Sequence, residues 1–198
     1  MVGRVIMLAV ESLFWAGLGA GLASVAGLRA FVVLALFGLF ARLGFVVPPG
    51  ILGLKSGWTF VLVLSVLAVV EIVLDKVRAL DPAFGYVMVP IRTMAGAALF
   101  ATVYEPAAAA PGLVAGGGIA ALVAVLGVIL RPSPTGSSAG VSTAFLSAVE
   151  DAVAVLGGIV GLFVPFLPLL FVGFLLFFFY RIRRRRGRKY GGLRILGD

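Results

Sequence analysis

Long apolar stretches alternate with short breaks along nearly the whole chain. A helix that crosses the hydrocarbon core of a bilayer needs about 20 mostly apolar residues, and most of the stretches are close to that length. The breaks contain Pro, Gly or charged residues, which are typical of turns and helix ends. The pattern therefore predicts seven hydrophobic helical segments, at about 6–26, 29–46, 58–77, 86–104, 112–130, 141–160 and 163–180.

The first two segments form one long apolar stretch that is interrupted only near Gly27-Leu28-Arg29. A turn at this point gives either two full spans or one span followed by a re-entrant segment, so six and seven spans are both compatible with the pattern. Glycines in the first half, at Gly17, Gly19 and Gly21, would let a neighbouring backbone approach closely. A second copy of the chain is a candidate neighbour, so we expect a homodimer.

The composition agrees with a membrane protein. Hydrophobic residues make up 62% of the 198 residues and charged residues 12%, whereas soluble domains average about 45–50% apolar and about 25% charged residues. Such a chain has too little polar surface to face water on all sides. We therefore predict an all-α transmembrane helical bundle over residues 1–180, which crosses the inner (plasma) membrane several times.

The chain contains neither cysteine nor histidine. This composition excludes disulfides, thiolate chemistry, imidazole bases and the usual zinc or haem ligands. The sequence also has no phosphate-binding glycine loop and no nucleophile elbow. We therefore expect a protein that is not an enzyme and that needs no cofactor.

Most of the net charge of +8 comes from residues 181–198, which hold eight of the 16 Lys and Arg residues. A basic segment directly after a membrane helix is a common topology signal and a contact for anionic lipid, and this explains the segment better than nucleic-acid binding does. We expect this basic tail to be cytoplasmic, together with Arg131 and the loop that follows Lys76. The N-terminus, Arg42 and Lys55 then lie outside.

Acidic residues interrupt two of the predicted helices in matching surroundings. Val66–Glu71 reads VLAVVE and Phe145–Glu150 reads FLSAVE, with Asp75 and Asp151 shortly after. An ionised carboxylate is costly in a bilayer core, so such residues normally face a partner, a polar cavity or a transport path. These acids are therefore the best candidates for function.

The match also suggests an internal repeat. Residues 29–105 and 112–180 would each form three helices, with the acid in the middle helix and a proline, Pro90 or Pro168, early in the last one. Because three is odd, adjacent copies would insert with opposite orientation, as in many transporters. The alternative is a chance similarity between two apolar helices.

Side-chain oxygens near the two acidic helices are candidates for binding an ion or a substrate. Glu71 and Asp75 are four residues apart and share one helix face. Carboxylate and hydroxyl oxygens suit a hard cation or a proton relay, and the alternative is a structural network of ion pairs and hydrogen bonds. The candidate oxygen-bearing residues are Glu71, Asp75, Thr143, Ser147, Glu150 and Asp151.

Arginines are the expected partners of these acids. Arg92 lies just after a proline in a predicted helix, and a broken helix at depth normally lines a cavity or packs against protein. We predict that Arg92 pairs with Glu71 or Glu150. Arg29 and Arg131 are the other candidate counter-ions, and Arg29 is also a candidate for the binding site. The alternative explanation of both is that they are ordinary loop arginines at the cytoplasmic face.

Four short motifs occur in order along the chain. They are Gly27-Leu28-Arg29-Ala30, Glu71 with Asp75-Lys76 (E-x-x-x-D-K), Ile91-Arg92, and Leu146-Ser147 with Glu150-Asp151 (L-S-x-x-E-D). In this combination the chain resembles a bacterial integral membrane family known only as domain of unknown function 4126. The resemblance covers nearly the whole chain. It implies an integral membrane protein whose polar residues act as a set, and it implies no activity.

Together these features favour a small proton- or cation-coupled secondary transporter or a channel-like protein for a small ion or solute. Glu71 and Glu150 would bind the ion, Asp75 and Asp151 would support them, and Arg92 would be the switchable partner. The alternatives are a lipid-handling protein with a charged groove, similar to a flippase or scramblase, and a non-transporting membrane scaffold.

Overall fold

The computed structural model describes residues 2–45, 57–77, 82–104, 109–131 and 143–191. Within these ranges the chain folds into seven helices and no strand, which confirms the predicted all-α bundle. The helices are α1 (Val2–Ala26), α2 (Ala30–Arg42), α3 (Trp58–Val77), α4 (Pro82–Val103), α5 (Ala109–Leu130), α6 (Thr143–Gly161) and α7 (Leu167–Gly191). Most bounds differ from the predicted ones by a few residues, but α7 continues well into the basic tail.

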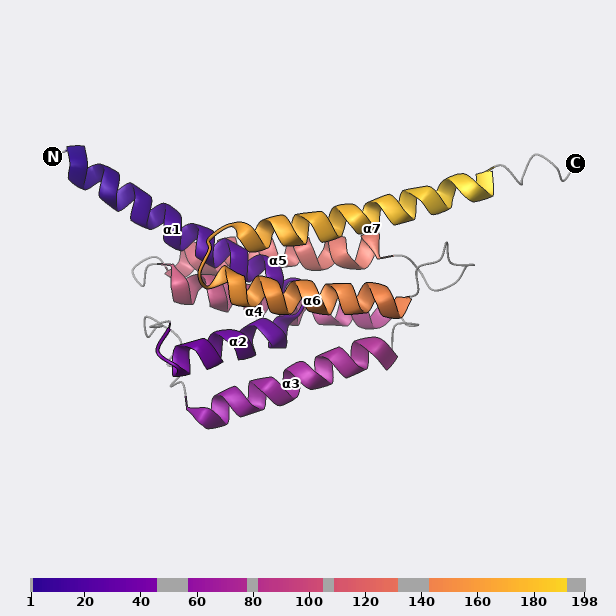
Figure 1. Ribbon diagram of the computed structural model, residues 1–198, viewed down its shortest axis with the longest axis horizontal. Helices are drawn as coiled ribbons and strands as arrows, with labels where there is room; N and C mark the ends of the chain where they lie inside the picture. Colours follow the sequence, from indigo (N-terminus) through magenta and orange to yellow (C-terminus); the bar gives the residue numbers. More distant parts are fainter. Residues whose placement is uncertain (1, 46–56, 78–81, 105–108, 132–142, 192–198) are drawn as a thin grey trace, which may run out of the picture.

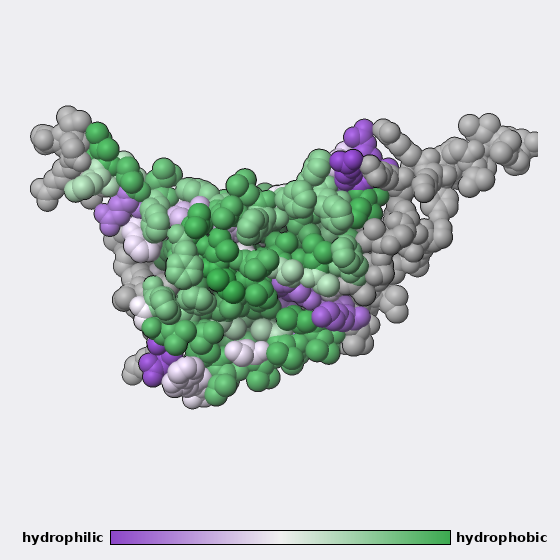
Figure 2. All heavy atoms as spheres, viewed as in Figure 1, coloured by the Kyte–Doolittle hydropathy of each residue, from purple (hydrophilic) through white to green (hydrophobic). Residues whose placement is uncertain are grey.

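The outside of the bundle is apolar. Large side chains such as Leu62, Val114 and Leu170 are 62%, 76% and 69% exposed. Among the described helices, α1, α3, α4 and α5 are long and apolar enough to cross a membrane. Figure 2 shows that hydrophobic residues form most of the viewed face. An apolar surface of this extent marks a protein that lies in lipid, so the chain is a membrane protein.

The helices lie along the long axis of the bundle, and their directions alternate (Figure 1). Helices α3, α5 and α7 run toward one end, and α4 and α6 return from it. We call the end where α3 and α5 finish, near Lys76 and Arg131, the basic end. The N-terminus of α1 and the end of α2 lie at the opposite end of the molecule.

Helices α1 and α2 form a hairpin whose tip lies inside the bundle. Figure 1 shows that α1 ends partway along the bundle and that α2 runs back toward the end from which α1 came. Helix α2 has 13 residues, which gives about 20 Å at roughly 1.5 Å per residue, against roughly 30 Å of hydrocarbon in a bilayer. Helix α2 is therefore too short to cross on its own, whereas α1 is long enough, and the arrangements with six and with seven spans both stay predictions.

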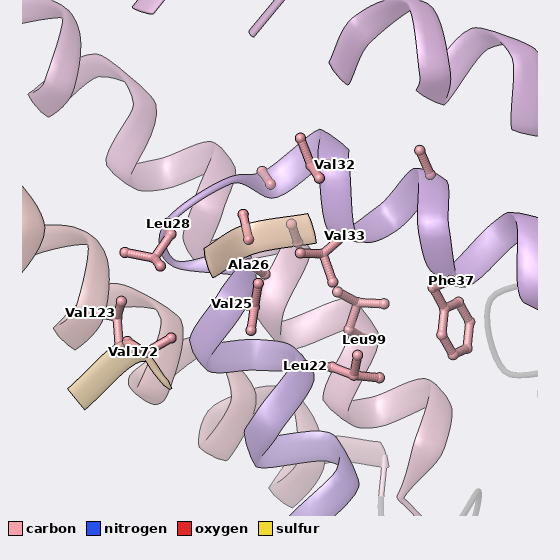
Figure 3. Close-up of a cluster of buried hydrophobic side chains, with 14 of the residues drawn as sticks. Leu22, Val25, Ala26, Leu28, Val32, Val33, Phe37, Leu99, Val123 and Val172 are labelled. Atoms are coloured by element: carbon pink, nitrogen blue, oxygen red, sulfur yellow. The ribbon is translucent and has the colours of Figure 1, made fainter. Parts of the chain in front are cut away.

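Close packing holds the tip of this hairpin in place. A Cβ atom at Gly27 would lie 2.7 Å from the backbone oxygen of Ala120 and 2.7 Å from the Cβ of Val123, so only glycine fits at this point. Buried apolar side chains surround the tip (Figure 3), and Leu28 and Val33 are 1% and 0% exposed. The apolar core thus forms around a chain reversal, and it determines where the next residue, an arginine, must lie.

The glycines of α1 pack against helices of their own chain. A Cβ atom at Gly19 would lie 3.0 Å from the ring of Phe100, and one at Gly21 would lie 3.2 Å from Pro168. Gly17 likewise faces a phenylalanine ring of the same chain. The suggestion that these glycines face a second copy is therefore wrong, and the homodimer stays a prediction without that support.

Helices α3 and α6 run in opposite directions, as an inverted repeat requires (Figure 1). Other features do not match in position. Glu71 lies in the second half of α3, whereas Glu150 lies in the first half of α6. Pro90 lies inside α4, whereas Pro168 is the second residue of α7. The inverted repeat therefore stays a prediction.

Candidate functional site, a buried ionic cluster

Arg29 stands at the tip of the hairpin and is fully buried, with 0% exposure. It is the N-cap residue of α2, and its extended backbone (φ −139°, ψ 98°) lets the chain reverse before the helix starts. Its Nη2 atom lies 2.7 Å from Asp75 Oδ2 and 2.8 Å from Asp151 Oδ1. One guanidinium thus connects the hairpin to α3 and to α6. The interpretation of Arg29 as an ordinary loop arginine is wrong, because the chain turns inside the bundle.

Asp75 is the most heavily bonded acid of the described residues. Arg29 donates to its Oδ2 atom at 2.7 Å, and the Ser147 hydroxyl donates to the same atom at 2.8 Å. Arg131 donates to both carboxylate oxygens, at 2.8 and 2.9 Å. Two parallel bonds of this kind are the strongest arrangement between an arginine and a carboxylate. Asp75 therefore joins the hairpin tip, α5 and α6 through one side chain.

Glu71, one helical turn earlier on α3, caps the N-terminus of α2. The backbone N–H of Ala30 donates to Glu71 Oε1 at 3.2 Å, and that of Phe31 donates to Oε2 at 3.0 Å. The first N–H groups of a helix have no partner within the helix, and the helix dipole favours a negative charge there. The side chain of Arg29 makes no cap hydrogen bond. The cap thus comes from another helix.

Arg92 approaches the same carboxylate from α4. Its Nε atom lies 3.8 Å from Glu71 Oε1, and the arginine side chain is 7% exposed. Pro90, which lies inside α4, has no N–H to donate and disturbs the helix one turn before it. The predicted pairing of Arg92 with Glu71 is therefore present as an ion pair. The distance of 3.8 Å is too long for a hydrogen bond.

The remaining members of the cluster lie toward the basic end. Arg131 Nη2 is 3.1 Å from Glu150 Oε2, and Lys76 Nζ is 3.5 Å from Asp151 Oδ2. The side chains of Lys76 and Asp151 are 51% and 14% exposed, so the cluster reaches the surface here. Figure 2 shows a hydrophilic strip that interrupts the apolar viewed face toward this end, where Figure 1 draws α3 and α6.

Positive and negative charges balance within this ionic cluster. We define it by four acids and four bases of the described residues, which are Glu71, Asp75, Glu150, Asp151, Arg29, Lys76, Arg92 and Arg131. Taking ions out of water is costly unless opposite charges compensate them closely. The balance explains how so many ionic groups can lie inside an apolar bundle.

The hydrogen bonding of the cluster is incomplete, although its charges are balanced. Six buried polar atoms of described side chains have no hydrogen-bond partner, namely Arg29 Nε and Nη1, Arg92 Nε, Glu150 Oε2, and Asp151 Oδ1 and Oδ2. The two acids lie near guanidinium groups, but at angles that do not form hydrogen bonds. Buried polar groups in proteins are almost always hydrogen-bonded, so these atoms mark the part of the cluster that can still form bonds.

Most of the residues that the sequence pointed to meet in this cluster. They are Arg29, Glu71, Asp75, Arg92, Ser147, Glu150 and Asp151. The side chain of Thr143 lies outside the described residues. Arg131, a candidate counter-ion from the sequence, also lies in the cluster. Lys76 is the addition, and the signal for it was a basic residue at the end of an apolar helix. Within the described part of the chain, no three His, Cys, Asp or Glu side chains are placed to hold a metal ion.

Comparison with known proteins places the chain in a family without assigned activity. The model of the family described as "Domain of unknown function (DUF4126)" matches residues 16–185. No curated protein and no solved structure matches the chain. The matched range includes every residue of the ionic cluster. Because the match covers most of the sequence, the chain belongs to the DUF4126 family, as its four motifs suggested.

Proposed function

We propose that this protein is a small secondary transporter in which protonation of a buried carboxylate is coupled to the movement of a solute. The observation that carries the proposal is the ionic cluster at the hairpin tip. It is charge-balanced, it lies between helices that cross the bundle, and its arginines keep unbonded donors. Transporters often place their sites where broken helices end near the middle of the membrane.

The charge balance supplies a physical reason for coupling. If a proton binds to Glu71, Arg92 loses the acid that lies 3.8 Å from it. A buried cation without its partner is strongly unfavourable, so the cluster must rearrange or bind a further negative group. Protonation of Glu150 would remove the acid that lies 3.1 Å from Arg131, but Arg131 would keep its two bonds to Asp75. Asp75 and Asp151 hold Arg29 in either state.

The orientation of the protein follows from its basic residues. Cytoplasmic loops and tails carry an excess of Lys and Arg, and the basic end holds Lys76, Arg131 and the basic part of α7. We place this end on the cytoplasmic side of the inner membrane, where the basic tail contacts anionic lipid. The ionic cluster then opens toward the cytoplasm, and the hairpin fills the outer half of the bundle.

A specific observation favours a second candidate function, the handling of lipids. The ion pair between the exposed Lys76 and the partly buried Asp151 joins two helices whose other surfaces are largely apolar. A polar strip on a side that faces lipid could contact headgroups as they pass. A third candidate, a scaffold, is favoured by the pairing of every charge in the cluster. The experiment below separates all three.

The test is reconstitution of Glu71→Gln and Glu150→Gln variants into liposomes. Glutamine keeps the shape of the side chain and removes its titration. An internal pH dye should report proton movement with the parent protein when a solute from a panel is added, and both variants should lose it while they remain folded. Glu11→Gln, at an exposed position on α1, is the matched control and should behave as the parent does.

The other candidates give different results in the same liposomes. A lipid-handling protein moves fluorescent lipids between leaflets, with or without a pH gradient. A scaffold moves neither protons nor lipids, and its glutamine variants change only the thermal stability. If both variants move protons at the rate of the parent, the proposed coupling is wrong.

A further inference from the structure

The N-terminus of α2 is an anion-binding site that an internal carboxylate occupies. Two backbone N–H groups, of Ala30 and Phe31, donate to the two oxygens of Glu71 at 3.2 and 3.0 Å. Helix N-termini bind phosphates and carboxylates of ligands in the same way. Here Glu71 comes from α3 and not from the turn before α2, so the cap is not part of the helix that it stabilises.

Buried arginine donors without partners lie at the same place. Arg29 precedes α2 directly, has 0% side-chain exposure, and leaves Nε and Nη1 unbonded. Arg92 points at Glu71 with its Nε atom 3.8 Å away, and this atom is also unbonded. A guanidinium group only donates hydrogen bonds, so these atoms can be satisfied only by a group that accepts. Their positions indicate that this part of the cluster can also bind a group that carries several acceptor oxygens.

We propose that the solute carries an anionic group, a carboxylate or a phosphate, which replaces the Glu71 carboxylate at the N-terminus of α2 when Glu71 is protonated. This inference rests on the proposed transport function and names the class of its substrate. The anion accepts from the N–H groups of Ala30 and Phe31 and from Arg92. Protonated Glu71 is neutral, so it no longer competes for these donors.

The exchange keeps the cluster electrically balanced. One proton neutralises one internal acid, and one bound monoanion restores the lost negative charge. The four bases then face three ionised acids and one anion in place of four ionised acids. The charged groups around Glu71 are Arg92 from α4, Arg29 at the tip and Asp75 on its own helix, and Arg131 of α5 links Asp75 to Glu150 of α6. None of them needs to change its charge.

Two sources can supply the same chemical group. A dissolved anion reaches the cluster from the basic end, where the side chain of Arg131 is 28% exposed. A lipid headgroup reaches it sideways, past the Lys76–Asp151 pair at 3.5 Å. Both sources offer oxygens with a negative charge, and the experiment distinguishes them.

The experiment measures thermal unfolding of the purified protein in a neutral detergent. The probes are acetate and inorganic phosphate, at constant ionic strength made up with sodium chloride. The parent should be stabilised by the probes in mildly acidic buffer and much less in mildly alkaline buffer. Glu71→Gln, which mimics the protonated acid, should be stabilised in both, with an apparent Kd in alkaline buffer at least about tenfold lower than that of the parent.

Further variants identify the donors. Arg92→Gln should abolish the stabilisation by acetate and phosphate. Ala30→Pro removes one N–H at the first position of α2, where proline fits a helix, and should weaken the effect. The exposed controls Glu11→Gln and Arg42→Gln should respond as the parent does. If Glu71→Gln does not fold, the inference is tested by the stabilisation of the parent by acetate and phosphate. This stabilisation should depend on pH in the parent and should be absent in Arg92→Gln.

Lipid nanodiscs separate the two sources of the anion. Stabilisation of Glu71→Gln by acetate in discs of phosphatidylcholine supports a dissolved anion. Stabilisation by discs of phosphatidylglycerol relative to phosphatidylcholine, without any effect of acetate, supports a headgroup. The inference is overturned if neither probe nor anionic lipid stabilises Glu71→Gln more than the parent. Proton flux without any anion binding would overturn this inference alone, whereas anion binding without flux would overturn only the proposed transport.

Discussion

At the scale of single residues, Asp75 shows how a buried ion can be stable in an apolar bundle. Its two oxygens accept hydrogen bonds from Arg29, Arg131 and Ser147, at distances between 2.7 and 2.9 Å. A buried carboxylate without such partners costs several kcal/mol. Because Arg29 and Arg131 are charged themselves, the loss of Asp75 would also leave these two arginines, of which Arg29 is fully buried, with less compensation.

We therefore expect Asp75→Asn to be one of the most destabilising changes of a single residue. Asparagine fits the same volume but removes the negative charge. The free energy of unfolding should fall by about 3 kcal/mol, the lower end for breaking a buried ion pair, because Asp151 and Glu150 still compensate the arginines. Unfolding in detergent measures the change, with Glu11→Gln as the control. Equal stability of Asp75→Asn and the parent would show that the pairing contributes little.

At the scale of secondary-structure elements, small residues determine how closely α4 and α5 approach. A Cβ atom at Gly116 would collide with Phe100 and would lie 2.5 Å from the backbone oxygen of Gly96. Small residues at such contacts are typical of helix packing in membranes. The contact matters for the site because α4 carries Arg92 and α5 ends next to Arg131. A change of helix spacing would therefore move two of the four basic groups.

Two glycines of α5 provide a matched test of this contact. Gly116→Ala should destabilise the protein by about 1–3 kcal/mol, the usual cost of overpacking. Gly118→Ala should leave the stability unchanged or raise it slightly, because nothing lies within 4 Å of the added atom and alanine favours the helix. Thermal unfolding of both variants in the same detergent is the measurement. Similar losses for both would mean that close approach of the helices is not what these glycines provide.

At the scale of the whole molecule, the arrangement separates two ends with different chemistry. Lys76, Arg131 and the basic part of α7 share one end, where the ionic cluster comes closest to the surface. The start of α1 and the end of α2 share the other end, because the hairpin returns to the side from which it came. This organisation gives the membrane orientation a direct test.

Single cysteines report the orientation, because the natural chain has no cysteine. Lys76→Cys and Arg183→Cys should react with a membrane-impermeant maleimide only in inside-out vesicles. Glu11→Cys and Arg42→Cys should react only in right-side-out vesicles. All four positions are exposed. Labelling of Lys76→Cys and Arg183→Cys from opposite sides would contradict the described bundle, and labelling of both from outside would reverse the proposed orientation.

The sequence alone determined the class of the protein and the place of its helices. Apolar length and the positions of Pro and Gly are local properties, so they predicted an all-α membrane bundle with bounds close to those observed. The cost of charge in lipid marked Glu71, Asp75, Glu150 and Asp151 as special, and all four lie in the cluster.

Only the tertiary structure decided which charges meet. Arg29 bonds to Asp75 across 46 positions and to Ser147 across 118, and no local pattern specifies such pairs. They depend on the depth at which the α1–α2 hairpin turns, which is set by apolar packing around Gly27. The same depth brings the N-terminus of α2 to Glu71. A loop arginine therefore became the centre of the cluster because the core around it, and not its own surroundings in sequence, fixed its position.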